Sequence, residues 1–248
     1  MSISRLTMQC AFIALFLLCR SSSARTLVAE KLTYRIEWRM VNAATANLQF
    51  QRAAGNTWQI DLDIESTGFV DRLYRILDKY RVSANDRMCA SNVDLDAQEG
   101  KRHMLAHLAF DNSRHKLDYT ERDLPKNTAK EKTLDIPACT YEVAGALAAL
   151  TQLDLQPGKS TALPVTDGKK LVNAKIESQA KERVTVDGKV HQTVRYEVFL
   201  FDNVLYKRKG RLFLWLTDDQ DKTPVQFQVQ LGFPIGTISL ELEKQQKF

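Results

Sequence analysis

The sequence lacks the residue patterns that identify common enzyme classes. It has four cysteines, ten glycines and six prolines in 248 residues, and no two cysteines stand in the CxxC spacing that is typical of redox and zinc sites. The GxSxG, HExxH and phosphate-binding glycine-loop patterns are all missing. A formal excess of five positive charges is too small to indicate a nucleic-acid partner. The sequence therefore favours a protein without catalytic activity, and it implies no cofactor and no metal.

Long hydrophobic runs are missing after the first two dozen residues. The one continuous apolar run, residues 10–19, follows Arg5 and is about half of the roughly 20 residues that a membrane-spanning helix needs. Small residues at Ser22 and Ala24 match the preferences of signal peptidase. We therefore expect a signal peptide over residues 1–24, cleaved after Ala24, and export to the periplasm. An uncleaved signal that anchors the protein in the inner membrane is the alternative.

Cysteines become scarcer still in the exported chain. Cleavage would leave Cys89 and Cys139 as the only two, an even pair in an oxidising compartment. A bridge between them would close a loop of about 50 residues and, by the chain-entropy estimate, add roughly 4 kcal/mol of stability. We expect this disulfide; two separate buried thiols are the alternative.

The main feature of the remaining sequence is alternation of apolar and polar residues. Leu32, Tyr34 and Ile36, for example, alternate with Thr33 and Arg35. A period of two places the apolar set on one face of a strand, as in antiparallel sheets with one buried face. The same alternation recurs in residues 44–50, 58–64, 104–110, 194–200, 225–231 and 238–242. Asp187-Gly188, between two such segments, is a hairpin-turn signal.

Two segments follow a helical period instead. A helix is expected at about residues 140–153, with Thr140 as its cap and Glu142 in its first turn. A short helical turn is expected at about residues 69–76. The polar stretch 121–132 reads as a mobile loop. The predicted fold is mainly β: a single antiparallel β-barrel or strongly curved sheet, in one domain over residues 25–248.

Three segments, taken in order, carry a family resemblance. They are residues 67–80, which include Thr67-Gly68-Phe69, residues 210–225 and residues 236–242. Behind a signal peptide, they resemble the bacterial exported family catalogued as domain of unknown function 3108, over about residues 32–242. The chain departs from the family pattern before the longer helix, where it has Cys139, Thr140 and Glu142. The resemblance implies an exported β-rich protein and no particular activity.

A binding or carrier protein for an apolar or lipid-like ligand is the favoured functional class. A curved sheet with an aromatic helical turn beside it can hold such a ligand in its mouth. Phe69, Leu73 and Tyr74 are the candidate lining residues, with ordinary core packing as the alternative for each. The sequence does not indicate the oligomeric state.

Two polar groups offer weaker alternatives. Asp218, Asp219 and Asp221 form an acidic cluster that would suit a hydrolase, but aspartates are also common in turns between strands. His103 and His107 share one face of a predicted strand, opposite its apolar residues, and are expected to be solvated rather than to bind a metal.

A basic run suggests a third class, an envelope scaffold that contacts lipid or another envelope component. Lys207, Arg208, Lys209 and Arg211 form the densest group of positive charges. Such a run is also common as a soluble turn between strands.

Overall fold

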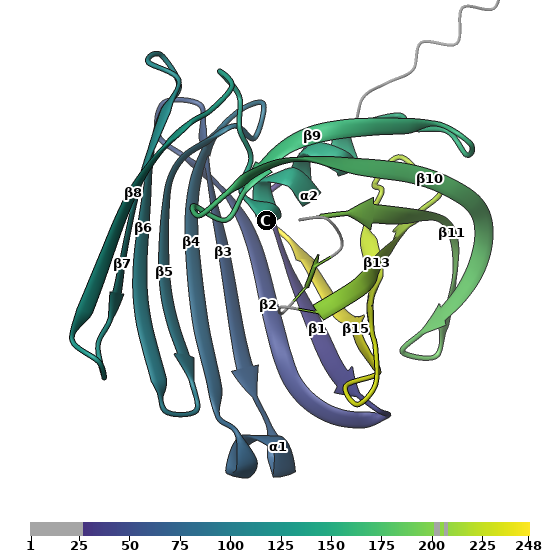
Figure 1. Cartoon of the computed structure of the whole chain (residues 1–248). Helices are drawn as coiled ribbons and strands as arrows, with labels where there is room; N and C mark the ends of the chain where they lie inside the picture. Colours follow the sequence, from purple (N-terminus) through teal and green to yellow (C-terminus); the bar gives the residue numbers. More distant parts are fainter. Residues whose placement is uncertain (1–26, 201–203, 206–207) are drawn as a thin grey trace, which may run out of the picture.

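The computed structural model describes residues 27–200, 204–205 and 208–248, so the expected signal peptide lies outside the described residues (Figure 1). The described part contains fifteen strands and two helices. In chain order they are β1 (Glu30–Trp38), β2 (Val41–Ala53), β3 (Thr57–Ser66), α1 (Gly68–Leu73), β4 (Ile76–Asn85), β5 (Ala90–Glu99), β6 (Arg102–Asp111), β7 (Lys116–Asp123), β8 (Thr128–Asp135), α2 (Val143–Gln152), β9 (Ser160–Thr166), β10 (Leu171–Val186), β11 (Lys189–Phe199), β12 (Val204–Leu205), β13 (Arg208–Thr217), β14 (Pro224–Leu231) and β15 (Thr237–Lys247).

The strands form one antiparallel sheet in the order β8-β7-β6-β5-β4-β3-β2-β1-β15-β14-β13-β11-β10-β9, and β12 pairs with β13. Most neighbours are hairpins; at the β10–β11 turn, Asp187 and Gly188 both have the positive φ that a tight hairpin turn requires. The sheet curls strongly but does not close, because β8 and β9 are its two edges (Figure 1). The prediction of a mainly β, strongly curved sheet is confirmed. No helix in the described ranges has the length and apolar character needed to cross a bilayer.

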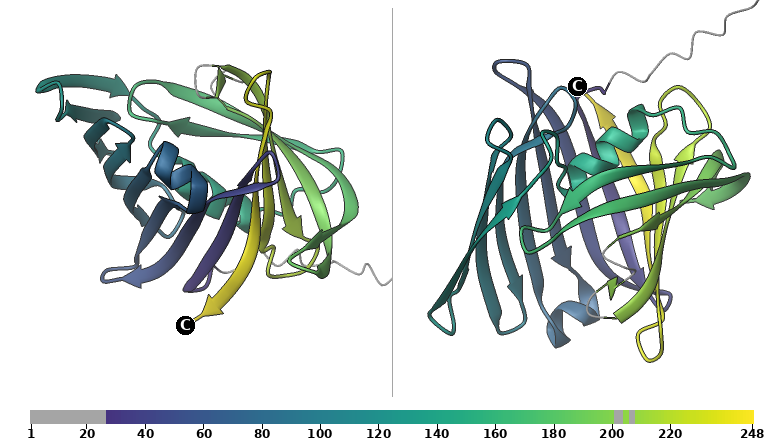
Figure 2. Two further views of the ribbon diagram at one scale, coloured as in Figure 1. Left: turned by 90° about the horizontal axis from the view of Figure 1, so that it is seen from below. Right: turned by 45° about the horizontal axis from the view of Figure 1, so that its top comes forward.

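Helix α2 lies inside the curve of the sheet, at one end of the strands (Figures 1 and 2). It packs with the apolar face of the sheet into one core. Gly145 brings the helix close to the β4–β5 turn, since a Cβ added there would lie 3.1 Å from the carbonyl oxygen of Met88. We call this end of the sheet the α2 end.

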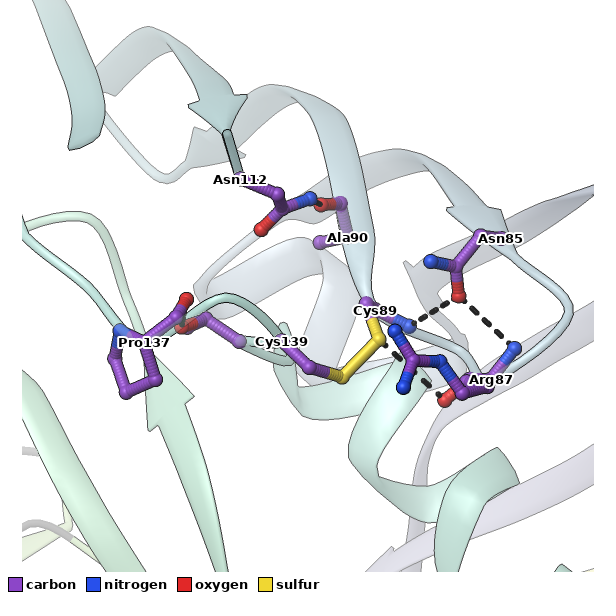
Figure 3. Close-up of a disulfide and its surroundings, with 8 residues drawn as sticks. Asn85, Arg87, Cys89, Ala90, Asn112, Pro137 and Cys139 are labelled. Atoms are coloured by element: carbon purple, nitrogen blue, oxygen red, sulfur yellow. Dashed lines mark hydrogen bonds between the residues drawn. A yellow bond between two sulfur atoms is a disulfide. The ribbon is translucent and has the colours of Figure 1, made fainter. Parts of the chain in front are cut away.

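The predicted disulfide is present and fixes the approach to α2. Cys89, in the β4–β5 turn, is bonded to Cys139, with their Cα atoms 4.9 Å apart (Figure 3). Beside it, the Asn85 side chain accepts hydrogen bonds from the backbone N–H groups of Arg87 and Cys89. The backbone N–H of Ala90 donates to the carbonyl oxygen of Thr140. The segment that leads into α2 is therefore attached to the sheet by both covalent and hydrogen bonds.

The two arms of the sheet meet where the β9–β10 turn contacts β7 and the edge strand β8; the Lys132 ammonium of β8 donates to the Lys169 carbonyl oxygen at 2.6 Å. The β9–β10 turn reaches β7, where Gly168 packs so closely on Tyr119 that a Cβ would lie 2.3 Å from the ring. The Lys169 ammonium pairs with Glu121 at 2.5 Å, and the Tyr119 hydroxyl donates to the same carboxylate at 2.6 Å. We call this contact the clasp. It joins the two arms of an otherwise open sheet.

Three sequence-based boundaries differ from the structure. The longer helix begins at Val143, and its cap is Glu142, whose carboxylate accepts from the N–H of Ala144; the hydroxyl of Thr140 donates to the Pro137 carbonyl instead. The short helix is residues 68–73, and strand β4 begins at residue 76. The predicted loop at 121–132 is wrong, because β7 and β8 pair through most of it.

Candidate functional site

The inner face of the sheet changes character along its strands. At the α2 end its apolar side chains are buried; on β3, for example, Trp58 and Ile60 are 2% and 0% exposed. Farther along the same strand, Leu62 and Ile64 are only partly buried. The same change occurs from Tyr34 to Ile36 on β1. Because α2 covers one end alone, the other end of the inner face keeps apolar surface that is accessible.

Cross-strand pairing joins these partly buried side chains into rows. One row runs across β11, β13, β14 and β15 through Val198, Leu212, Val229 and Ile238, and it ends at the exposed Trp38 of β1. On the other arm, Leu62 of β3 is two strands away from Leu95 of β5. We call the partly buried apolar set the inner apolar surface. It consists of Ile36, Leu62, Ile64, Leu95, Val198, Leu212, Phe227, Val229, Ile238 and Leu240.

A carboxyl group lies among the apolar side chains of the inner face. Asp78 of β4 pairs with Ile64 on one side and Ala97 on the other, and it is 7% exposed. Its Oδ1 atom is buried without a hydrogen-bond partner among the described residues. Burial, followed by the negative charge of Glu99, raises the pKa of Asp78 to about 6. The inner face therefore offers one polar group that can be neutral or charged near neutral pH.

The three predicted lining residues lie at the end of the sheet opposite α2 (Figure 1). Phe69 and Leu73 belong to α1, at the end of the strands opposite α2, and Tyr74 directly follows them (Figure 1). All three are exposed, so none of them packs in the core. The Tyr74 ring rests on Gly100, in the β5–β6 turn. The helical period that pointed to them was real, but its apolar residues face outward.

The acidic cluster forms a turn at the α2 end. Asp219 accepts hydrogen bonds from the Thr217 hydroxyl and from the backbone N–H groups of Asp221 and Lys222. Asp218 pairs with Lys181 at 2.7 Å, and Asp221 pairs with Lys247 at 2.6 Å. A hollow of about 30 Å³ lies beside Asp218 and Asp219, which is small for any organic substrate. Each of these carboxylates has a role in holding the turn.

The two histidines lie on the outer face, as their spacing predicts. His103 contacts Asp96 at 2.8 Å, and His107 contacts Asp94 at 2.7 Å. Both contacts are cross-strand pairs between β6 and β5. Among the described residues, no group of three or more histidine, cysteine, aspartate or glutamate side chains is placed to hold a metal ion.

The basic run is divided by the structure. Lys207 lies outside the described residues, and Arg208 begins β13. Arg211 donates to both oxygens of Glu197, at 2.8 and 3.0 Å, and these bonds lower the pKa of Glu197. The Arg211 guanidinium also lies over the Phe213 ring, 4.6 Å from its centroid. In this run, Arg211 is therefore part of the outer face of the sheet.

Sequence reasoning missed the inner apolar surface as a site. Alternation predicted which side chains share a face, and those predictions hold for Leu62, Ile64 and Leu240. It could not predict where burial ends along each strand, because that depends on where α2 packs. Asp78 carried no signal either, since a single aspartate in a strand pattern resembles an ordinary outward-facing residue.

A solved structure that is similar to this chain shares its fold. A β-barrel-like protein of domain of unknown function DUF1849 from Brucella abortus matches with a TM-score of 0.56 and 11% identity, covering 90% of this chain and 98% of that one. A putative exported protein with a YmcC-like fold from Bacteroides fragilis matches with a TM-score of 0.39 and 8% identity, at the same coverage. The first similarity supports the barrel-like fold alone.

The sequence comparisons give the family. A search of curated proteins gave no match. The model of a family described as a protein of unknown function, DUF3108, matches residues 33–243. This range includes most of β1, most of β15 and all of the strands and helices between them. The chain therefore belongs to the DUF3108 family.

Proposed function

We propose that this protein is a non-enzymatic carrier that holds an apolar or lipid-like ligand against its inner apolar surface. The observation that supports the proposal is the incomplete covering of the inner face by α2. Strands β1, β3, β11 and β13 each have buried apolar residues at the α2 end and partly exposed ones toward the other end. Accessible apolar area costs free energy in water, roughly 25 cal/mol per Å². A ligand with an acyl chain would recover that free energy.

The ligand would enter from the end opposite α2. The disulfide and the buried side chains around α2 block the other end. Phe69, Leu73 and Tyr74 then stand at the entrance, where they would be the first side chains that an incoming ligand meets. Asp78 would face the ligand as its polar contact, since its Oδ1 atom is buried and unpaired among the described residues.

The place of action in this proposal is the periplasm. Residues 1–24 have the features of a cleaved signal peptide, and the disulfide suits an oxidising compartment. In the mature chain, residues 25–248 would act as a single domain, because all of the strands described belong to one sheet.

The test is binding of a pyrene-labelled fatty acid to delipidated protein. We expect saturable binding by the unmodified chain. A Leu62→Gln or Leu240→Gln variant should bind about fivefold more weakly, because each removes roughly 1 kcal/mol of apolar contact. Leu95→Trp should also weaken binding, since it fills the space without adding polarity.

The matched control is Val184→Gln. Val184 is likewise partly buried, but it packs against a separate apolar cluster on the outer face, with Val186, Phe213 and Trp215. The Val184→Gln variant should bind the fatty-acid probe with the same affinity as the unmodified protein. Absence of saturable binding, or an equal loss in Val184→Gln, would refute the carrier proposal. Far-ultraviolet circular dichroism of each variant verifies that the sheet is intact.

A further inference from the structure

The end of the sheet opposite α2 exposes an unusual amount of large apolar surface. Its rim consists of residues 38–41, 67–75, 100–101, 124–127 and 232–236, which form the turns β1–β2, β3–β4, β5–β6, β7–β8 and β14–β15 (Figure 1, bottom; Figure 2, left). Twelve large apolar side chains are exposed in the described part of the chain. Eight of them belong to this rim: Trp38, Met40, Val41, Phe69, Leu73, Tyr74, Leu124 and Phe233.

Two of these side chains project almost fully into solvent. Met40 is 93% exposed and Phe233 is 92% exposed, while Phe69 and Leu73 are 65% and 69% exposed. Turns of a monomeric protein are normally polar, and exposed apolar clusters mark binding surfaces. The turns at the α2 end follow the normal rule: residues 54–56, 86–89, 112–115 and 218–223 contain none of the exposed large apolar side chains.

Hydrogen bonds connect neighbouring turns of the rim into one surface. The Trp38 indole donates to the Ile235 carbonyl at 2.8 Å, which joins the β1–β2 and β14–β15 turns. The backbone N–H of Gly100 donates to the Arg75 carbonyl at 2.7 Å, which joins the α1 segment to the β5–β6 turn. The apolar side chains are therefore presented by connected turns rather than by independent ones.

The charge of the rim is positive. It contains five cations, Arg39, Arg72, Arg75, Lys101 and Lys126, and one acid, Asp71. Asp71 accepts from the Ser66 hydroxyl, and Lys126 pairs with Asp123. The other four cations make no ion pair with any residue that the structure describes. At the far end of the sheet, the 218–223 turn carries three aspartates and one lysine, so the two ends differ in sign.

We propose that this rim docks on the surface of a lipid bilayer that contains anionic phospholipid. Phe69, Leu73, Met40 and Phe233 enter the boundary between headgroups and acyl chains, and the four unpaired cations contact lipid phosphates. Apolar insertion combined with basic residues is the physical basis of interfacial membrane binding. Trp38 lies at the depth that tryptophan favours, between the two layers. This docking does not require a ligand on the inner apolar surface.

Tryptophan fluorescence offers a direct readout. The chain has three tryptophans; Trp58 and Trp215 are 2% and 7% exposed, whereas Trp38 is 39% exposed. Adding vesicles of phosphatidylglycerol and phosphatidylcholine should shift the emission to the blue. Bromine-labelled lipid in the same vesicles should quench it. Trp38→Phe should remove both effects and leave sedimentation with the vesicles nearly unchanged.

Vesicle sedimentation tests the two components of the rim. Phe69→Ser with Leu73→Ser should lower the partition coefficient about tenfold or more, because two large apolar side chains are lost. Arg72→Glu with Arg75→Glu should lower it by a similar factor on anionic vesicles. Binding by the unmodified protein should also fall as salt rises, since screening weakens surface attraction.

The matched control variants change residues outside the rim. Val190→Ser removes an exposed apolar side chain outside the rim, and Arg87→Glu reverses an exposed charge in the β4–β5 turn; both should bind vesicles like the unmodified chain. Equal loss in rim and control variants, or no sedimentation with anionic vesicles, would overturn the proposal. So would rim-dependent dimerisation without vesicle binding, which would assign the surface to a second copy of the chain.

The docking and carrier proposals fail separately. Met40→Ser with Phe233→Ser, two rim residues that are not part of the proposed ligand entrance, should lower vesicle binding and leave the affinity for the soluble fatty-acid probe unchanged. Leu62→Gln should show the opposite behaviour.

Discussion

At the scale of single residues, Asp78 is the clearest departure from the usual rules for strands. A carboxyl group on a buried apolar face loses its hydration, and the Oδ1 atom of Asp78 has no hydrogen-bond partner among the described residues that would replace it. Its pKa of about 6, against an ordinary value of 3.8, expresses this cost. The difference corresponds to about 3 kcal/mol that the folded state loses when the group ionises.

The pH dependence of stability follows from the direction of this shift. Between about pH 4 and pH 6, the folded protein binds a proton at Asp78 that the unfolded chain has released. The free energy of unfolding therefore falls as the pH rises through this window, and the contribution of a protonated Asp78 is lost above it. Asp78→Asn should flatten that part of the profile and stabilise the protein by up to about 3 kcal/mol at pH 8, measured by urea unfolding.

The control is Asp118→Asn, an exposed aspartate that accepts from the Thr133 hydroxyl. It should leave the slope between pH 4 and pH 6 as it is in the unmodified protein. A profile for Asp78→Asn that still falls in this window would show that another group causes the pH dependence.

Single residues also show how much of the structure could be predicted from the sequence. Alternation predicted the inner position of Leu62 correctly, and compartment chemistry predicted the partner of Cys89. The three rim residues Phe69, Leu73 and Tyr74 stay predicted ligand-lining residues, and the alternative of core packing does not hold because all three are exposed. An apolar residue at helical spacing reads as core unless the turn around it is known to stand outside the sheet.

At the scale of elements, α2 owes its position to the sheet more than to its own sequence. Ten residues are short for a helix that must be stable alone. Its attachment is the segment from Cys139 to Glu142, fixed by the disulfide, by the Thr140 carbonyl and by the Glu142 cap. Without that attachment, the helix would have to find its place against the sheet by packing alone.

Removing the disulfide should therefore destabilise the protein strongly. Cys89→Ser with Cys139→Ser should lower the free energy of unfolding by up to about 4 kcal/mol, since the bridge closes a loop with a sequence separation of 50. Urea unfolding measures the loss. Dithiothreitol should produce a similar loss in the unmodified protein and none in the double variant; a reductant effect that persists in the variant would contradict this cause.

Strand β8 explains why one element escaped prediction. Its residues, Thr128–Asp135, are nearly all exposed, and Lys130, Glu131 and Lys132 follow each other without alternation. Alternation appears only where one face of a strand is buried, and an edge strand exposed on both faces lacks it. Charged side chains on such an edge also oppose pairing with another sheet. The polar composition that suggested a loop is the composition of a protected edge.

At the scale of the whole molecule, the clasp is one of two contacts that connect the arms of the open sheet. The β9–β10 turn meets β7 through Gly168, Lys169, Tyr119 and Glu121. The two edges pair with each other nowhere along this strand order. The arms are connected by the clasp and by the segment before α2, where Ala90 of β5 donates to the Thr140 carbonyl and Tyr141 pairs with Val165 of β9. We expect the distance between the arms, and with it the access to the inner apolar surface, to depend on both contacts.

A substitution at Gly168 should open the clasp. Gly168→Ala places a methyl group against the Tyr119 ring at a backbone φ of +84°, and we expect a loss of about 2–4 kcal/mol from steric overlap and backbone strain together. Gly188→Ala is the matched control: its φ is +73°, but nothing lies within 4 Å of the added Cβ. It should lose only about 1–2 kcal/mol. If urea unfolding shows the same loss of unfolding free energy for both variants, the contact between Gly168 and Tyr119 does not contribute to stability.

The overall architecture was accessible from the sequence because repeated alternation leaves few ways to bury so many strands. The position of α2 and the meeting of the edges were not accessible, since both depend on contacts between residues distant in the chain. Gly168 and Tyr119 illustrate the point: each is unremarkable in its own segment, and only the curl of the sheet brings them together.

The pairing of β1 with β15 determines from which end of the sheet a tag or tether at either terminus would extend. The backbone N–H of Phe248 donates to the Ala29 carbonyl, so both ends of the described chain lie together at the α2 end, about ten residues of strand, or roughly 30 Å, from the rim. A tag or tether at either terminus would thus leave the rim unobstructed.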